Sequence, residues 1–96
     1  MNEDIQLYEA IYEAMENSYR VIVKREDPYH MMEDSDLEII FAHHLDSPIT
    51  VSLIENMIKW WEKEEQYEMC AELKHIENEI KRLSKRYKGE GVTHIA

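Results

Sequence analysis

Two residues in the second half of the chain have the spacing of a metal site. Glu72 and His75 form a Glu-x-x-His pair, which places two ligands on one helical face in di-iron four-helix proteins. Such a site needs two copies of the pair, and because the sequence holds one, only a dimer completes the set. The apolar positions Leu73 and Ile76 also direct His75 away from the expected core. We therefore predict no metal site and assign Glu72 and His75 to the surface.

The only cysteine, Cys70, excludes an internal disulfide and fits a reducing compartment. A catalytic thiol needs a base within hydrogen-bond reach. Cys70 follows Met69 at the edge of an apolar stripe, where a cysteine usually behaves as a small hydrophobe. The sequence has no glycine-rich phosphate loop and no nucleophile elbow. We expect no catalytic residues, no cofactor and no enzymatic activity.

Composition indicates a small acidic helical protein. The 96 residues carry 21 acidic and 11 basic side chains, a formal charge of −10, and 44% of them are hydrophobic, enough for one thin core. Two glycines and two prolines are too few for an all-β sandwich. No run approaches the roughly 20 apolar residues of a membrane span, and the first four residues are acidic rather than signal-like. We expect an all-α, cytoplasmic protein with no membrane partner.

Apolar residues at alternating spacings of three and four predict a first helix from Asn2 to Lys24. Pro28 disfavours helix at Asp27 and ends the pattern. Ile11 widens the stripe, and we place it in the core. The stripe itself consists of Ile5, Tyr8, Tyr12, Met15, Tyr19 and Ile22.

The middle of the chain predicts a loop over residues 28–34 and then a short helix. Ser35 and Glu38 have capping-box spacing. Ser47 and Pro48 then suit the cap and first position of a third helix. The short helix would bury Leu37, Ile40, Phe41, His44 and Leu45.

We place a break between the last two predicted helices at residues 64–66, with one continuous helix as the alternative. The third would bury Val51, Ile54, Ile58 and Trp61. The fourth repeats apolar residues by four and three, and Gly89 is a natural stop. We expect one domain over residues 1–88, a flexible tail over 89–96, and a small bundle of about four helices. Its two long, coiled-coil-like helices, the first and the fourth, would pack along heptad seams. The seam of the fourth helix is Met69, Leu73, Ile76, Ile80, Leu83 and Tyr87.

Residues 67–74 resemble the second-helix signature of the UVR-type helical hairpin of bacterial excision-repair proteins. Tyr67, Glu68, Ala71 and Leu73 match that signature, while Cys70 and Lys74 are conservative departures, and His75 replaces a usual Asp. The resemblance covers at most residues 51–84. Family members use this hairpin to bind partner proteins, so the resemblance implies a docking module.

Aromatic residues supply the candidate partner-binding positions. Trp60 and Trp61 are adjacent, so their side chains point about 100° apart on a helix. Trp61 continues the core series, whereas Trp60 continues a second stripe with Leu53 and Met57 that a small bundle leaves partly exposed. We expect a protein-interaction module, an adaptor or regulator that also self-associates. The three tyrosines equally suit packing in or at the edge of the core. The expected partner-binding residues are Trp60, Leu53, Met57, Tyr8, Tyr12 and Tyr19.

Charge suggests two further hypotheses. Residues 1–80 accumulate −14, as in an acidic inhibitor that mimics nucleic acid, of a kind encoded by phages. Residues 41–52 resemble the bacterial helix-turn-helix pattern, but Asp46 stands where glycine is usual and Lys59 is a lone nearby cation. A basic patch follows near the C-terminus, where a helix dipole also explains it, and we expect no direct nucleic-acid binding. The patch consists of Lys81, Arg82, Lys85, Arg86 and Lys88.

Overall fold

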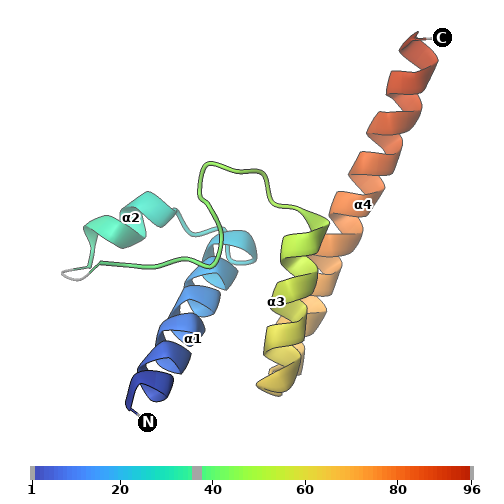
Figure 1. Ribbon diagram of the computed structural model, residues 1–96. Helices are drawn as coiled ribbons and strands as arrows, with labels where there is room; N and C mark the ends of the chain where they lie inside the picture. The colour runs from blue at the N-terminus through green and yellow to red at the C-terminus, as the bar shows by residue number, and fades with distance from the viewer. Residues whose placement is uncertain (1, 36–37, 96) are drawn as a thin grey trace. The chain divides into compact units, whose positions relative to one another are not determined.

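The computed structural model describes residues 2–35 and 38–95, with side chains for residues 3–35 and 38–85. All regular structure in these ranges is helical, in four helices, which confirms the all-α class (Figure 1). No helix in the described ranges combines the length and hydropathy needed to cross a membrane. The chain divides into two compact units, Met1–Pro48 and Ile49–Ala96. The helices are α1 (Asn2–Ile22), α2 (Pro28–Glu33), α3 (Val51–Lys63) and α4 (Tyr67–Ile95).

The first helix, α1, ends two residues before the predicted boundary. Acidic residues in its first turn complement the positive end of the helix dipole. After Ile22 the chain reverses at Arg25, which has a φ of 60°, and the Glu26 N–H donates to the Arg20 carbonyl at 3.1 Å. The helix therefore ends through a left-handed residue, before Pro28 can act.

Burial on α1 is concentrated near its C-terminal end. Asn17, Ser18, Tyr19 and Ile22 are buried there. Ile11 is 37% exposed, so its predicted place in the core is wrong. The physical reason is local, because the segment after α2 contacts α1 through Asn17 and Ser18, one to two turns beyond Ile11.

The loop predicted over residues 28–34 is wrong, because α2 occupies most of it. Asp27 has extended backbone angles and its side chain accepts the Tyr29 N–H at 2.9 Å. Pro28 takes the first helical position, where its missing N–H costs nothing. Asp-Pro thus starts a helix here, and Met31 is its buried residue.

The short helix predicted after Ser35 is also wrong. Residues 38–50 form no helix, and Leu37 lies outside the described residues. Side chains of α1 hold this segment instead: Asn17 Nδ2 donates to the Ile40 carbonyl at 3.0 Å, and the Ala42 N–H donates to Ser18 Oγ at 2.8 Å. These bonds give the backbone partners that a helix would otherwise supply. The helix-turn-helix resemblance fails for the same reason.

The cap of α3 lies three residues later than predicted. Ser47 forms part of a turn, where its N–H donates to the His44 carbonyl at 3.2 Å. Thr50 has extended backbone angles, and its Oγ1 accepts the Leu53 N–H at 3.2 Å. The predicted roles of Ser47 as cap and Pro48 as first residue are therefore wrong.

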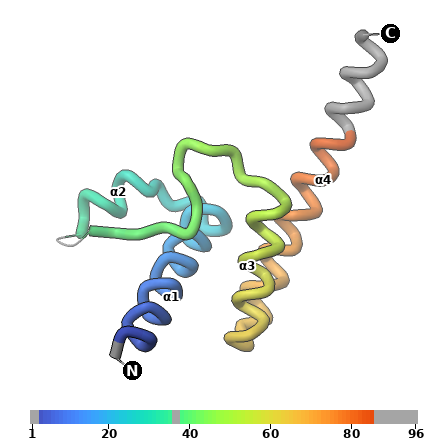
Figure 2. Tube along the Cα trace, viewed as in Figure 1, coloured from blue at the N-terminus to red at the C-terminus, as the bar shows by residue number. Residues whose placement is uncertain are grey.

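Helices α3 and α4 form a helical hairpin and lie side by side (Figures 1 and 2). The predicted break at residues 64–66 is confirmed. Glu65 has a φ of 60°, the Gln66 N–H donates to the Trp61 carbonyl at 2.9 Å, and the Glu65 N–H donates to the Glu62 carbonyl at 3.0 Å. This pair of bonds is a Schellman motif with Glu65 where glycine is usual.

The buried seam of α3 runs between the two predicted stripes. Ile54, Met57 and Trp61 are fully buried, at spacings of three and four. Trp61 is therefore a core residue, as predicted. Met57 belongs to the core as well, which corrects its assignment to a partly exposed second stripe. The flanking residues Val51, Leu53, Ile58 and Trp60 are half-buried.

The fourth helix extends past its neighbour. With 13 residues in α3 and 29 in α4, their lengths are about 20 and 44 Å. Leu83 is 53% exposed, so its predicted place in the seam is wrong, because it lies about 120° around α4 from the buried Glu77. Gly89 does not stop the helix, which continues to Ile95, while the Tyr87 side chain lies outside the described residues. Packing between the first and fourth helices stays a prediction.

Candidate interaction surfaces

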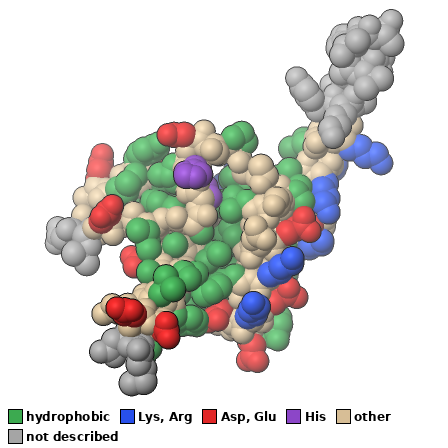
Figure 3. All heavy atoms as spheres, in the orientation of Figure 1, with side chains coloured by type: hydrophobic (Ala, Val, Ile, Leu, Met, Phe, Trp, Pro, Cys, Tyr) green, Lys and Arg blue, Asp and Glu red, His purple; other side chains and the backbone are tan. Residues whose placement is uncertain are grey.

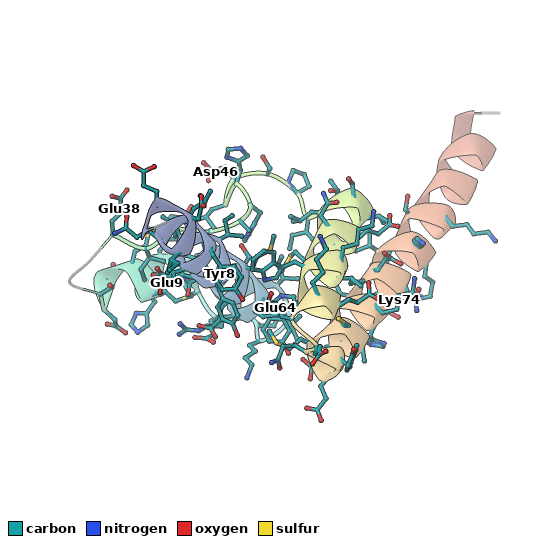
Figure 4. All side chains as sticks on the ribbon, turned by 60° about the horizontal axis from the view of Figure 1, so that its bottom comes forward. Tyr8, Glu9, Glu38, Asp46, Glu64 and Lys74 are labelled. Carbon is teal, nitrogen blue, oxygen red and sulfur yellow. The ribbon has the colours of Figure 1, made fainter. Side chains whose placement is uncertain are left out.

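The first turns of α1 carry exposed apolar side chains. Ile5 is 54%, Tyr8 46% and Ile11 37% exposed, and we call these three residues the α1 stripe. They span about 120° of the helix surface, from 100° per residue. Tyr8 and Glu9 are labelled on this helix in Figure 4. An exposed apolar stripe of this kind is typical of a binding surface.

Acidic residues are the only charged side chains on the part of α1 that carries the stripe. Five acidic residues lie between positions 2 and 19, all of them exposed, and this stretch contains no Lys or Arg. Figure 3 shows acidic side chains beside the start of the helix. A partner that covers the stripe must therefore tolerate or supply positive charge. The five residues are Glu3, Asp4, Glu9, Glu13 and Glu16.

The partner-binding residues predicted from sequence fall into three groups. Tyr8 is exposed, and its ring centroid lies 6.2 Å from that of the half-buried Tyr12. Tyr19 is buried at 6%, so its assignment to a partner surface is wrong. Tyr19 lies near the C-terminal end of α1, next to Asn17 and Ser18, which bind the backbone of residues 40–42. Of the partner-binding residues predicted on α3, Met57 is buried, whereas Leu53 and Trp60 are half-buried. Sequence reasoning missed Ile5 as a surface residue because it belongs to the same periodic stripe as the buried Ile22.

The second unit has a groove where α3 begins beside α4. Its volume is about 570 Å³, within the usual range for binding sites. Ile49, Val51 and Ile80 supply apolar side chains, and Lys81 and Lys85 supply positive charge. The positive end of the α3 dipole also lies there. We call it the α3–α4 groove, lined by Ile49, Thr50, Val51, Ile80, Lys81, Ser84 and Lys85.

The described part of the predicted basic patch is exposed and partly neutralised. Lys81 Nζ lies 3.4 Å from Glu77 Oε2, and Arg82 Nη2 lies 2.8 Å from Glu79 Oε2. Figure 3 shows Lys and Arg side chains along the α4 side of the molecule. The side chains of Arg86 and Lys88 lie outside the described residues. The patch therefore supplies local positive charge, with Lys85 at the rim of the groove.

Glu77 is a carboxylate in the middle of the α4 seam. Only 1% of it is exposed, four residues after the buried Leu73. Lys74 Nζ donates to its Oε2 at 2.6 Å, and this hydrogen bond lowers the pKa of Glu77. The predicted seam passed through Ile76 and Ile80, which are half-buried. Lysines at i−3 and i+4 of a Glu are typical of an exposed helix face, so the sequence gives no signal for this buried position.

A buried polar cluster joins α1 to the segment after α2. Ser18 Oγ lies 2.7 Å from His43 Nδ1 and also accepts the Ala42 N–H. Burial lowers the pKa of His43, which favours the neutral ring, whose Nδ1 can accept the Ser18 O–H. The Phe41 and His43 rings meet edge to face at 6.2 Å. Sequence reasoning missed this cluster, because a Ser on an apolar helix does not reveal its partner.

A polar cavity of the first unit lies between α1 and α2. Arg20 forms two hydrogen bonds to the Glu26 carboxylate, at 2.7 and 3.0 Å, which lower the pKa of Glu26. His30 and Asp34, 3.4 Å apart, are also in its lining. The charge of Arg20 is thus neutralised by Glu26, and the remaining charged residues that line the cavity are mainly acidic.

The residues considered for chemistry are not brought together. Glu72 and His75 are both exposed, and no cluster of three or more metal-ligating side chains occurs in the described residues. Cys70 Sγ lies 3.6 Å from the Ile58 carbonyl. Burial, and then the charge of Glu62, raise the pKa of Cys70 and favour the unreactive thiol.

Comparison with known proteins gives no relative. No family model, no curated protein and no solved structure matches the chain.

Proposed function

We propose that this protein is a non-enzymatic interaction module, an adaptor or regulator that binds a protein partner through its helical faces. The observation that carries this proposal is the α1 stripe, in which Ile5 and Ile11 stay exposed on an ordered helix. Apolar side chains exposed at helical spacing are typical of helix-in-groove recognition. The single cysteine and the absence of a membrane-spanning helix in the described residues support a cytoplasmic setting.

Two further observations support a binding role over a catalytic one. The raised pKa of Cys70 works against thiolate chemistry. Residues 67–74, which resemble the UVR-type signature, open the second helix of the α3–α4 hairpin. A docking hairpin is what that resemblance implies.

The test is affinity capture with a matched pair of variants. Ile5→Lys and Gln6→Lys each add one positive charge at an exposed position of α1, and the Gln6 side chain points about 100° or more away from every residue of the α1 stripe. Tagged at the C-terminus, wild type and Gln6→Lys should capture the same proteins from a lysate of the native host. Ile5→Lys should lose them while keeping the wild-type circular dichroism spectrum. Capture that is identical with all three baits would contradict the proposal.

Mimicry of nucleic acid is a second candidate, favoured by one observation. The five carboxylates of α1 are all exposed, with no cation among residues 2–19. A mimic should bind a DNA- or RNA-binding protein, be displaced by duplex DNA, and release at about 0.5 M salt. A partner held by the α1 stripe should stay bound under both conditions, because apolar burial is insensitive to salt screening.

A further inference from the structure

Two exposed surfaces of this chain have complementary chemistry. The α1 stripe is apolar and bordered by carboxylates, among them Glu9, which lies four residues from Ile5 on the same side of the helix. The α3–α4 groove is apolar and bordered by Lys81 and Lys85. Each surface therefore has the charge that the other needs at its rim.

We propose that the α1 stripe of one chain docks into the α3–α4 groove of a second copy of this chain. The inference rests on the proposed function, because it uses the same stripe as the binding surface and names the partner. It is a contact between two different patches of the protein, a heterologous contact.

Charge excludes the two self-complementary alternatives. Stripe against stripe would bring together two helices with five carboxylates each and no cation over residues 2–19. Groove against groove would place Lys81 and Lys85 of one copy against the same residues of the other. Like charges opposed across an interface are strongly unfavourable, so only stripe against groove satisfies both surfaces.

The net charge of −10 does not prevent this contact. Screening limits repulsion between whole chains to about 8 Å at physiological salt, so the local pairing decides. The surfaces are small, and we expect weak association with a Kd of roughly 10–100 µM.

The experiment is sedimentation velocity on two single variants and their mixture. Ile5→Lys places a charge in the α1 stripe and leaves the α3–α4 groove unchanged. Lys85→Glu reverses a charge at the rim of the groove and leaves the α1 stripe unchanged. Their controls are Gln6→Lys and Lys63→Glu, which make the same charge changes at other exposed positions. Circular dichroism checks that every variant is folded.

We expect the mass of wild type to rise with concentration, up to about 0.5 mM. Each test variant alone should associate about tenfold or more weakly, and each control should behave as wild type. An equimolar mixture of Ile5→Lys and Lys85→Glu should recover association at twice the chain mass, because one intact stripe then meets one intact groove.

Three results would overturn the inference: a monomeric wild type over this range, a mixture that stays monomeric, or controls that act like the test variants. If wild type is monomeric but still captures another protein through Ile5, the proposed function stands and the second copy is the wrong partner. Loss of both properties removes both proposals.

Discussion

The two units of the chain are stabilised by different interactions. In the second unit, apolar side chains of α3 are fully buried within a helical hairpin, and Trp61 is the largest of them. In the first unit, Asn17 and Ser18 are buried beside Tyr19 and Ile22, and they hold an irregular segment by hydrogen bonds to its backbone. Apolar seams tolerate changes of detail, whereas a buried polar cluster is sensitive to each partner. The hairpin should therefore be the more robust unit.

Removal of Trp61 should have the largest effect. We expect Trp61→Ala to lower the free energy of unfolding by about 3–5 kcal/mol, since the fully buried indole leaves a cavity. Trp60→Ala is the control, because the half-buried Trp60 should cost much less. Guanidinium denaturation followed by circular dichroism measures both. Equal losses would mean that both indoles are core residues.

Ser18 should be the most sensitive position of the first unit. Ser18→Ala leaves the Ala42 N–H and His43 Nδ1 without their partner, which costs about 1–3 kcal/mol. Ser52→Ala, at an exposed position of α3, should change little. In Ser18→Ala, hydrogen exchange should become faster in residues 38–44 and keep the wild-type rate in the α3–α4 hairpin. Uniform acceleration in both units would contradict their separate stabilisation.

Acid should weaken the first unit before the second. Burial lowers the pKa of His43 below its ordinary 6.5, so the unfolded ring takes a proton more readily than the folded one. Stability from His43 is therefore complete above about pH 6.5 and is lost as the pH falls through the lowered value. Ser18, Phe41 and His44 are the groups that contact or act on this ring.

In the second unit, the contribution of Glu77 to stability should be lost at a lower pH than that of His43 in the first unit. The hydrogen bond from Lys74 lowers the pKa of Glu77 below 4.5, so its contribution is lost only as the pH falls through that lowered value. Hydrogen exchange at about pH 7.5, 5.5 and 4 should show residues 38–44 loosening first. His43→Asn, with an amide oxygen in place of Nδ1, should remove the early step. Simultaneous loosening of both units would contradict this order.

The smallest effect concerns the two residues with positive φ. Arg25 and Glu65 each have a φ of 60°, one after α1 and one after α3. Arg25→Gly and Glu65→Gly should each raise the free energy of unfolding by about 0.5–1 kcal/mol, because glycine adopts this conformation without strain. Glu64→Gly, at a φ of −85°, is the control and should lower stability. Thermal unfolding measures all three, and a loss in either of the first two would mean that the side chain contributes a contact.

The hairpin could be predicted from sequence because its determinants are periodic. The core role of Trp61 follows from its spacing, whereas the break at residues 64–66 is one of two alternatives that the sequence leaves open. Met57 and Glu77 could not be predicted, because the exact centre of a buried seam depends on how the neighbouring helix packs.

Much of the first unit could not be predicted, for a physical reason. An Asp-Pro pair can end one helix or start the next, and the sequence of Asp27-Pro28 does not say which. The extended backbone angles of Asp27 show that it caps the start of α2. The apolar spacing of residues 37–45 is helical, yet residues 38–45 form no helix, and hydrogen bonds with Asn17 and Ser18 hold the backbone at Ile40 and Ala42. The exposure of Ile5 could not be predicted, because Ile5 shares its helical spacing with the buried Ile22. Contacts between residues more than 20 positions apart have no local signal in the sequence.

The most direct test of the α1 stripe as the binding surface is hydrogen exchange on the bound chain. Wild type is compared alone at high dilution and in its complex, whether the partner is a second copy or a captured protein. We predict slower exchange in peptides that cover residues 3–13, with residues 28–34 unchanged. A stable complex in which residues 3–13 exchange as fast as in the dilute chain would contradict the assignment.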